Sequence, residues 1–143
     1  MNYRKVNDRI FVSLQTGDLI NESLRLIAVE ENILNAWING IGAIDNVEVG
    51  YMDVKNKKYQ KRNFDEHYEL LSLIGNITYK DGEPFVHTHV TFSNAEYNVF
   101  GGHLFDAKIT ATGEIVLSLT DSKIDREYNE NIGINTWCLH ESH

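Results

Sequence analysis

One amphipathic segment followed by a long series of strand-like segments is the pattern that most constrains the fold. Between residues 19 and 32 apolar side chains recur at helical spacing, and Asp18 precedes them as a predicted N-cap. From Asn35 to residue 119, short apolar or alternating runs are separated by glycine and turn residues. Most connections are too short for crossover helices, so we expect a mainly antiparallel sheet. The sequence predicts an α+β domain, with one main helix flanking a strongly bent or barrel-like sheet.

The predicted strands are marked by β-branched and aromatic residues, and the turns by glycine, asparagine and aspartate. Asp81-Gly82 predicts a tight hairpin turn. Gly40 and Gly42 predict a bend where two backbones approach closely. The tail from Asp121 is polar, with Arg126 and Trp137 as its larger features. The predicted strands are 9–14, 36–39, 47–52, 69–78, 84–92, 101–109 and 114–119.

Length and charge exclude several classes of protein. The chain has 143 residues, and we expect residues 1–143 to form a single domain with its core from 9 to 139. The formal net charge of −8 opposes binding to phosphate backbones. A basic cluster between Lys55 and Arg62 is expected to be a solvated hairpin or loop. No apolar run can span a bilayer and no signal peptide is evident, so we expect a cytoplasmic protein without a membrane partner.

Three histidines are the candidate metal ligands. His87 and His89 stand two residues apart in the predicted strand 84–92, so their side chains point to one face. His103 follows two glycines on the next predicted strand and can supply a third imidazole. Three neutral imidazoles with an open fourth position form a site for zinc or a related divalent metal. The alternative is a hydrogen-bond network at an interface.

A metal at these histidines would permit catalysis if a general acid or base lay nearby. Glu69 is the main candidate and Glu114 a second, since each begins a predicted strand near the histidines. The alternative is that both carboxylates are solvated at strand edges. We interpret Cys138 as a packing residue. The remaining histidines are expected to be exposed to solvent: His67, His140 and His143.

An ordered set of motifs resembles the PPC domain (plants and prokaryotes conserved). The resemblance covers roughly residues 9 to 139. It implies a mainly antiparallel, barrel-like sheet with a flanking helix, and association as homotrimers. In some prokaryotic members the equivalent histidines hold a metal, which assigns that role to His87, His89 and His103. The segments that carry the resemblance are 40–43, 49–53, 69–77, 82–90, 101–104 and 112–116, with Arg126 later in the chain.

The resemblance also brings a family label of DNA-binding protein, from plant members in which the domain follows AT-hooks. This chain has no Arg-Gly-Arg-Pro core, which is the part of an AT-hook that grips the minor groove. We therefore expect a trimeric, metal-binding protein of regulatory or unassigned role, with DNA a partner only by that label. The alternative is a metal-dependent enzyme acting on an unidentified small molecule in the histidine cleft. Zinc suits three imidazoles, although iron, nickel and copper also accept them.

Cupins also carry a His-x-His motif on a β-barrel strand. Their pattern places a glutamate four or five residues after the second histidine. Residues 90–95 contain none, and Glu96 comes late, in a predicted turn. We therefore reject the cupin interpretation.

Overall fold

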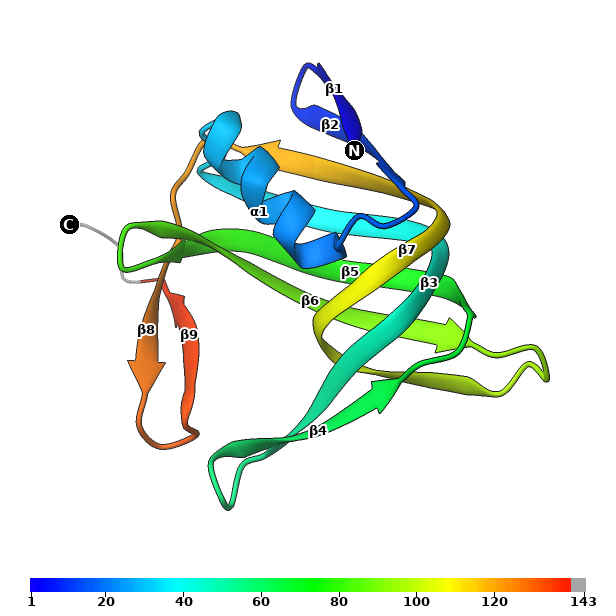
Figure 1. Ribbon diagram of the computed structural model, residues 1–143. Helices are drawn as coiled ribbons and strands as arrows, with labels where there is room; N and C mark the ends of the chain where they lie inside the picture. The colour runs from blue at the N-terminus through cyan, green and yellow to red at the C-terminus, as the bar shows by residue number, and fades with distance from the viewer. Residues whose placement is uncertain (140–143) are drawn as a thin grey trace.

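The computed structural model describes residues 1–139, which form one nine-stranded sheet and one helix (Figure 1). Within these residues no helix is long and apolar enough to cross a bilayer. The elements in chain order are β1 (Asn2–Val6), β2 (Arg9–Gln15), α1 (Ile20–Glu30), β3 (Asn35–Asp53), β4 (Lys58–Phe64), β5 (Tyr68–Lys80), β6 (Glu83–Ser93), β7 (Val99–Thr120), β8 (Asp125–Asn129) and β9 (Ile134–Cys138).

Four strands give the sheet its strong bend. β3 pairs with both β5 and β7, and β6 pairs with the same two strands, so the pairings run in a circuit. The sheet curls into a partial ring, with α1 lying across it (Figure 1). Every strand pairing is antiparallel except that of β5 with β8. The predicted α+β class and mainly antiparallel sheet are thus confirmed, with a partial ring as the form of the bend.

Two very long strands replace four of the shorter predicted ones. The predicted strands 36–39 and 47–52 are halves of β3, and 101–109 and 114–119 are halves of β7. The chain bends at register shifts between β3 and β7 instead of breaking. Gly42 permits this bend, because a Cβ there would lie 2.5 Å from the carbonyl oxygen of Thr112. The predicted close backbone approach is therefore confirmed.

The helix begins one residue later than predicted and is capped differently. Leu19 is the N-cap of α1 and makes no side-chain capping bond. The Asp18 carboxylate instead accepts the N–H of Gln15 at 2.8 Å and lies 2.9 Å from the N-terminal amine. The Asp106 carboxylate of β7 accepts the backbone N–H groups of Asn21 at 3.0 Å and Glu22 at 3.3 Å. A strand distant in sequence thus supplies the cap that Asp18 was predicted to supply.

The helix and the sheet enclose one apolar core. The buried face of α1 packs against β6 and β7. On β6 the core side chains are Thr88, Val90 and Phe92, which alternate with the more exposed His89 and Thr91. The alternation predicted for this strand is confirmed. The histidines therefore lie on the face of β6 that points away from the core.

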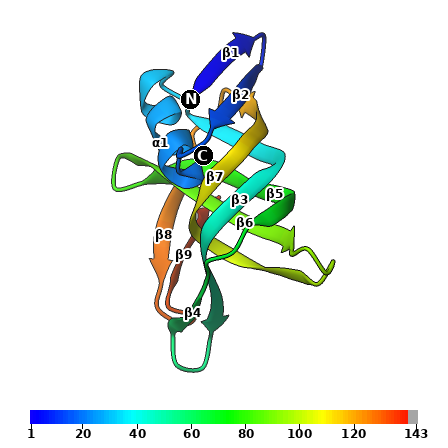
Figure 2. The same ribbon diagram turned by 45° about the vertical axis from the view of Figure 1, so that its right-hand side comes forward.

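Two hairpins project from the same end of the sheet, as Figures 1 and 2 show. The basic cluster lies on the β3–β4 hairpin, as predicted. The second hairpin, β8–β9, lies in the segment that the sequence indicated only as a polar tail. Lys57 donates a hydrogen bond to the carbonyl oxygen of Glu130, which joins the tips of the two hairpins. Arg126 on β8 is 8% exposed, so this segment belongs to the folded body.

Candidate metal centre

The three predicted ligands converge. His89 on β6 is directly opposite His103 on β7, and His87 is two residues from His89 on the same face. One ligand atom from each ring lies within 4.8 Å of the other two. The ring centroids are 5.1 to 5.5 Å apart. We call these three residues the triad.

The triad has the chemistry and nearly the spacing of a metal site. Zinc–nitrogen bonds of about 2.0–2.1 Å place the ligand atoms of one ion roughly 3–4 Å apart, so small side-chain rotations would suffice. Nδ1 of His103 is buried and has no hydrogen-bond partner among residues 1–139. A buried polar atom without a partner is costly, and a bound ion would offset that cost. The residues present therefore fit a divalent metal.

Two of the triad rings are held neutral. Burial lowers the pKa of His87 to about 4, with smaller contributions from His103, Arg126 and His89. Burial also lowers the pKa of His103 to about 4, with smaller contributions from His89 and Lys61. Unprotonated imidazole is the form that ligates metals. Both rings are therefore available as ligands at neutral pH without first losing a proton.

Arg126 is the charged group that contacts the triad. Its Nε donates to Thr78 Oγ1 at 2.7 Å, Nη2 to Asn76 Oδ1 at 2.8 Å, and Nη1 to the carbonyl oxygen of Asn135 at 3.0 Å. These bonds fix the β8–β9 hairpin to β5. Nη2 also lies 3.3 Å from Nδ1 of His87. The sequence marked Arg126 as part of a family motif but gave no sign that it lies beside the histidines.

The contact between Arg126 and His87 determines which nitrogen of the neutral imidazole carries the proton. A guanidinium only donates hydrogen bonds, so Nδ1 of His87 accepts here and the neutral ring carries its proton on Nε2. A metal bound at Nδ1 would take the lone pair that Arg126 now uses. A metal bound at Nε2 would move the proton to Nδ1, which would then face a donor. Metal ligation by His87 and this hydrogen bond therefore exclude each other.

Aromatic side chains surround His103. The Tyr59 ring stacks on it with centroids 4.7 Å apart, and the Phe105 ring meets it edge-on at 5.0 Å. Lys61 Nζ lies 3.8 Å from the centroid of Phe105. Tyr59 comes from β4, within the basic cluster. Strand periodicity within β6 and β7 could not have revealed it, because it reaches the triad only through the β3–β4 hairpin.

The triad opens into a cleft of about 550 Å³. β6 and β7 pair from Ser93 and Val99 as far as His89 and His103, where their pairing ends. The cleft lies beyond this point, between the N-terminal turns of α1, the side chain of Tyr59 and the β8–β9 hairpin. A volume of this size accommodates a small organic ligand. The predicted cleft beside the histidines is therefore present.

Comparison with known proteins decides the family. A sequence profile of the Plants and Prokaryotes Conserved (PCC) domain matches residues 1–121. The chain belongs to this family. PCC and PPC abbreviate the same family name, so the resemblance is confirmed. A search of curated proteins gives no match.

Solved structures resemble this PCC domain over nearly its whole length. A protein of Bacteroides thetaiotaomicron, provisionally named a DNA-binding protein, is 31% identical with a TM-score of 0.93, and the match covers 96% of each chain. A PPC protein of Pyrococcus horikoshii is 34% identical with a TM-score of 0.86, covering 98% of this chain and 95% of that one. An Archaeoglobus fulgidus protein named metal-containing is 32% identical with a TM-score of 0.85, covering 96% and 99%.

The candidate carboxylates of this PCC domain lie away from the triad. Glu69 on β5 pairs with Ser93, whereas Asn76 of the same strand pairs with His87. The nearest triad residue, His89, pairs with Ile74, which is five residues along β5 from Glu69, or roughly 16 Å at about 3.3 Å per residue. Glu114 is exposed on β7, opposite Ile41. The group of possible metal ligands therefore contains neither carboxylate.

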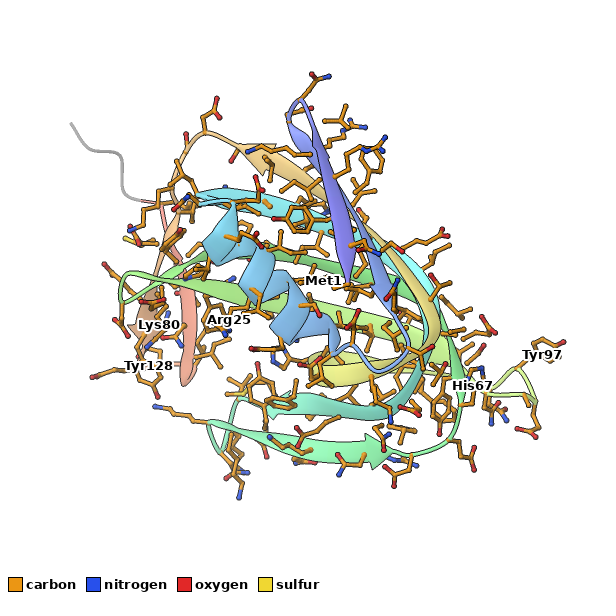
Figure 3. All side chains as sticks on the ribbon, turned by 45° about the horizontal axis from the view of Figure 1, so that its top comes forward. Met1, Arg25, His67, Lys80, Tyr97 and Tyr128 are labelled. Carbon is orange, nitrogen blue, oxygen red and sulfur yellow. The ribbon has the colours of Figure 1, made fainter. Side chains whose placement is uncertain are left out.

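Among the described residues, His67 and Cys138 take no part in the triad. His67 is exposed between β4 and β5, as predicted, and lies at the opposite end of the molecule from Arg25 and Tyr128 (Figure 3). Cys138 is half-buried on β9. His140 and His143 lie outside the described residues.

Proposed function

We propose that this PCC-domain protein binds a divalent metal, zinc by preference, through His87, His89 and His103. The observation that carries the proposal is the convergence of one nitrogen from each of three rings within 4.8 Å of one another, together with a buried, unpartnered Nδ1 on His103. The low pKa values of His87 and His103 support it, since both rings are unprotonated at neutral pH. The name of the metal-containing relative from Archaeoglobus fulgidus supports it independently. The all-nitrogen ligand set suits zinc, and iron, nickel and copper are the other metals that it accepts.

The metal content of the purified protein tests this proposal. We expect close to one ion per chain in protein prepared without added metal, and less than about one tenth in His89→Ala, because three-histidine sites lose affinity steeply when a ligand is removed. His67→Ala is the matched control, because His67 lies far from the triad and should leave the metal content unchanged. Wild-type protein that holds less than about one tenth of an ion per chain after incubation with zinc would refute the proposal.

A metal held by three side chains has an open coordination position, which can polarise a carbonyl group or lower the pKa of bound water. The cleft beside the triad gives a small molecule access to this position. An enzyme acting on a small molecule is therefore the alternative function, favoured by this cleft. Glu69 and Glu114 are not positioned to serve it. Any general acid or base would have to come from the groups that line the cleft.

We infer that the protein forms the homotrimer that the family resemblance implies. The face of the sheet opposite the core presents an apolar hollow of about 830 Å³. Phe11, Ile41 and Leu71 line it and are 49%, 55% and 47% exposed. Exposed apolar surface of this kind marks association sites. A subunit interface would remove these side chains from water.

Light scattering of an Ile41→Glu variant tests the trimer. We expect the wild type to show three chain masses, and the variant mainly one, because the interface would have to bury an unpaired carboxylate. Tyr97→Glu is the control, since Tyr97 lies on an exposed turn at the end of the molecule (Figure 3). A wild-type monomer, or an Ile41→Glu trimer, would contradict this assignment.

DNA binding is the weaker alternative and rests on the names of relatives from Bacteroides thetaiotaomicron and Ralstonia eutropha. The net charge of −8 opposes it. Part of the basic cluster is already engaged, because Lys61 lies 3.1 Å from Glu48 and also over the Phe105 ring. A cytoplasmic location stays a prediction.

A further inference from the structure

The cleft beside the triad contains one cation that no acidic side chain balances. Glu22 lines the cleft and is paired with Arg25 at 2.9 Å. Asp106 also lines it, and its carboxylate accepts backbone N–H groups at the start of α1. Arg126, in contrast, has no carboxylate partner within residues 1–139.

The charge of Arg126 is not needed for its structural bonds. Its partners Thr78, Asn76 and the Asn135 carbonyl are neutral, so a neutral donor could also fix the β8–β9 hairpin. A guanidinium stays protonated even when it is buried, and removing it from water without a counter-ion is costly. At 8% exposure Arg126 bears most of this cost. An anionic ligand in the cleft would supply the missing counter-ion.

Metal binding, as proposed above, would also release a donor. The Nη2 group of Arg126 shares its hydrogens between Asn76 and Nδ1 of His87. Since His87 cannot ligate a metal and accept this hydrogen bond together, ligation leaves one N–H of Arg126 without its acceptor. The planar guanidinium matches a carboxylate in geometry and charge. The freed N–H donor and the unbalanced positive charge of Arg126 thus both favour a ligand with a carboxylate group.

The remaining walls of the cleft favour an apolar body with a polar substituent. Tyr59, Phe85 and Leu104 are among the side chains that line it. Asn135 lines it too, and its Oδ1 is buried without a hydrogen-bond partner among residues 1–139. A ligand hydroxyl group that reached this oxygen would supply its missing donor. We propose that the cleft binds a small organic acid, with its carboxylate on Arg126 beside the triad and its apolar body against the aromatic walls.

Binding of mandelate tests the proposal, because this acid combines a carboxylate, a hydroxyl group and a phenyl ring. By isothermal titration of the protein as purified, we expect mandelate to bind at least tenfold more tightly than its uncharged methyl ester. Arg126→Gln should weaken mandelate binding at least tenfold. Arg9→Gln is the matched control, because Arg9 is exposed on β2 and does not line the cleft, and it should change the affinity less than twofold.

Each outcome separates this inference from the proposed metal site. Equal binding of acid and ester, no mandelate binding at millimolar concentration, or unchanged binding by Arg126→Gln would overturn it. The comparison of mandelate with its methyl ester uses wild-type protein. It therefore tests the inference even if the Arg126→Gln substitution loosens the β8–β9 hairpin. The metal content is measured on the same samples. Loaded protein that does not bind mandelate refutes this inference alone, whereas protein that stays metal-free after incubation with zinc but binds mandelate through Arg126 refutes only the metal proposal.

Discussion

Replacement of Gly75 by alanine is expected to lower the free energy of unfolding by at least about 3 kcal/mol, at the upper end of overpacking costs. Gly75 lies on β5 opposite Thr88 of β6. A Cβ at Gly75 would lie 2.1 Å from the carbonyl oxygen of His87 and 2.8 Å from Cα of Thr88. Both atoms belong to the backbone, so no side-chain rotation relieves the clash. β5 and β6 must separate, which weakens the pairing on which the ring depends.

The same substitution should reduce metal binding. The obstructed carbonyl belongs to His87, so a displaced β6 moves two of the three proposed ligands relative to His103. Chemical denaturation and metal analysis of one preparation measure both effects. Thr91→Ala is a suitable control, because Thr91 is exposed on β6 and should change stability by no more than about 0.5 kcal/mol. A Gly75→Ala variant within about 1 kcal/mol of wild type and fully loaded would show that the two strands separate at little cost.

The features that could be predicted from the sequence are those that short segments determine. The alternation on β6 requires only a period of two, and it placed His87 and His89 on the face away from the core. The turn at Asp81-Gly82 requires left-handed backbone at both residues, and their φ angles are 52° and 86°. The triad was predictable for the same reason, since two of its histidines share a strand and the third follows on the next.

The features that were missed depend on residues far apart in the sequence. The cap of α1 comes from Asp106, 85 residues after Asn21, and it displaced the local candidate Asp18. The segment carrying Arg126 lacks apolar alternation, and its β8 strand joins the sheet through one pairing between Tyr79 and Asp125. The breaks predicted within β3 and β7 are bulges, which keep the strands continuous. Composition alone cannot distinguish a bulge from a turn.

The side chains that line the candidate site are also features that depend on residues far apart in the sequence. Glu69 was chosen for its place at the start of a strand near the histidines in sequence, but the register of β5 on β6 puts it near the far end of the pair. Arg126 and Tyr59 reach the triad through hairpins that only the folded ring positions. The clustering of the three histidines could therefore be predicted from the sequence, and the groups that surround them could not.

Removal of the proposed metal is the second change expected to have a large effect. A ligand that binds only the folded state at a thousandfold excess over its Kd stabilises that state by about 4 kcal/mol. For a domain of this size each kcal/mol changes the Tm by about 2–4 °C. A chelator should therefore lower the Tm of the loaded wild-type protein by roughly 8–16 °C, as scanning calorimetry can measure.

His103→Ala separates this effect from ordinary destabilisation. The variant loses a proposed ligand and the ring that packs between Tyr59 and Phe105, but it also loses the unpartnered buried Nδ1. These contributions oppose one another in metal-free protein, so the informative quantity is the difference in Tm with and without zinc. We expect that difference to vanish in His103→Ala and to persist in His67→Ala. If zinc stabilised His103→Ala as much as the wild type, the ion would be bound elsewhere and the triad would not be the metal centre.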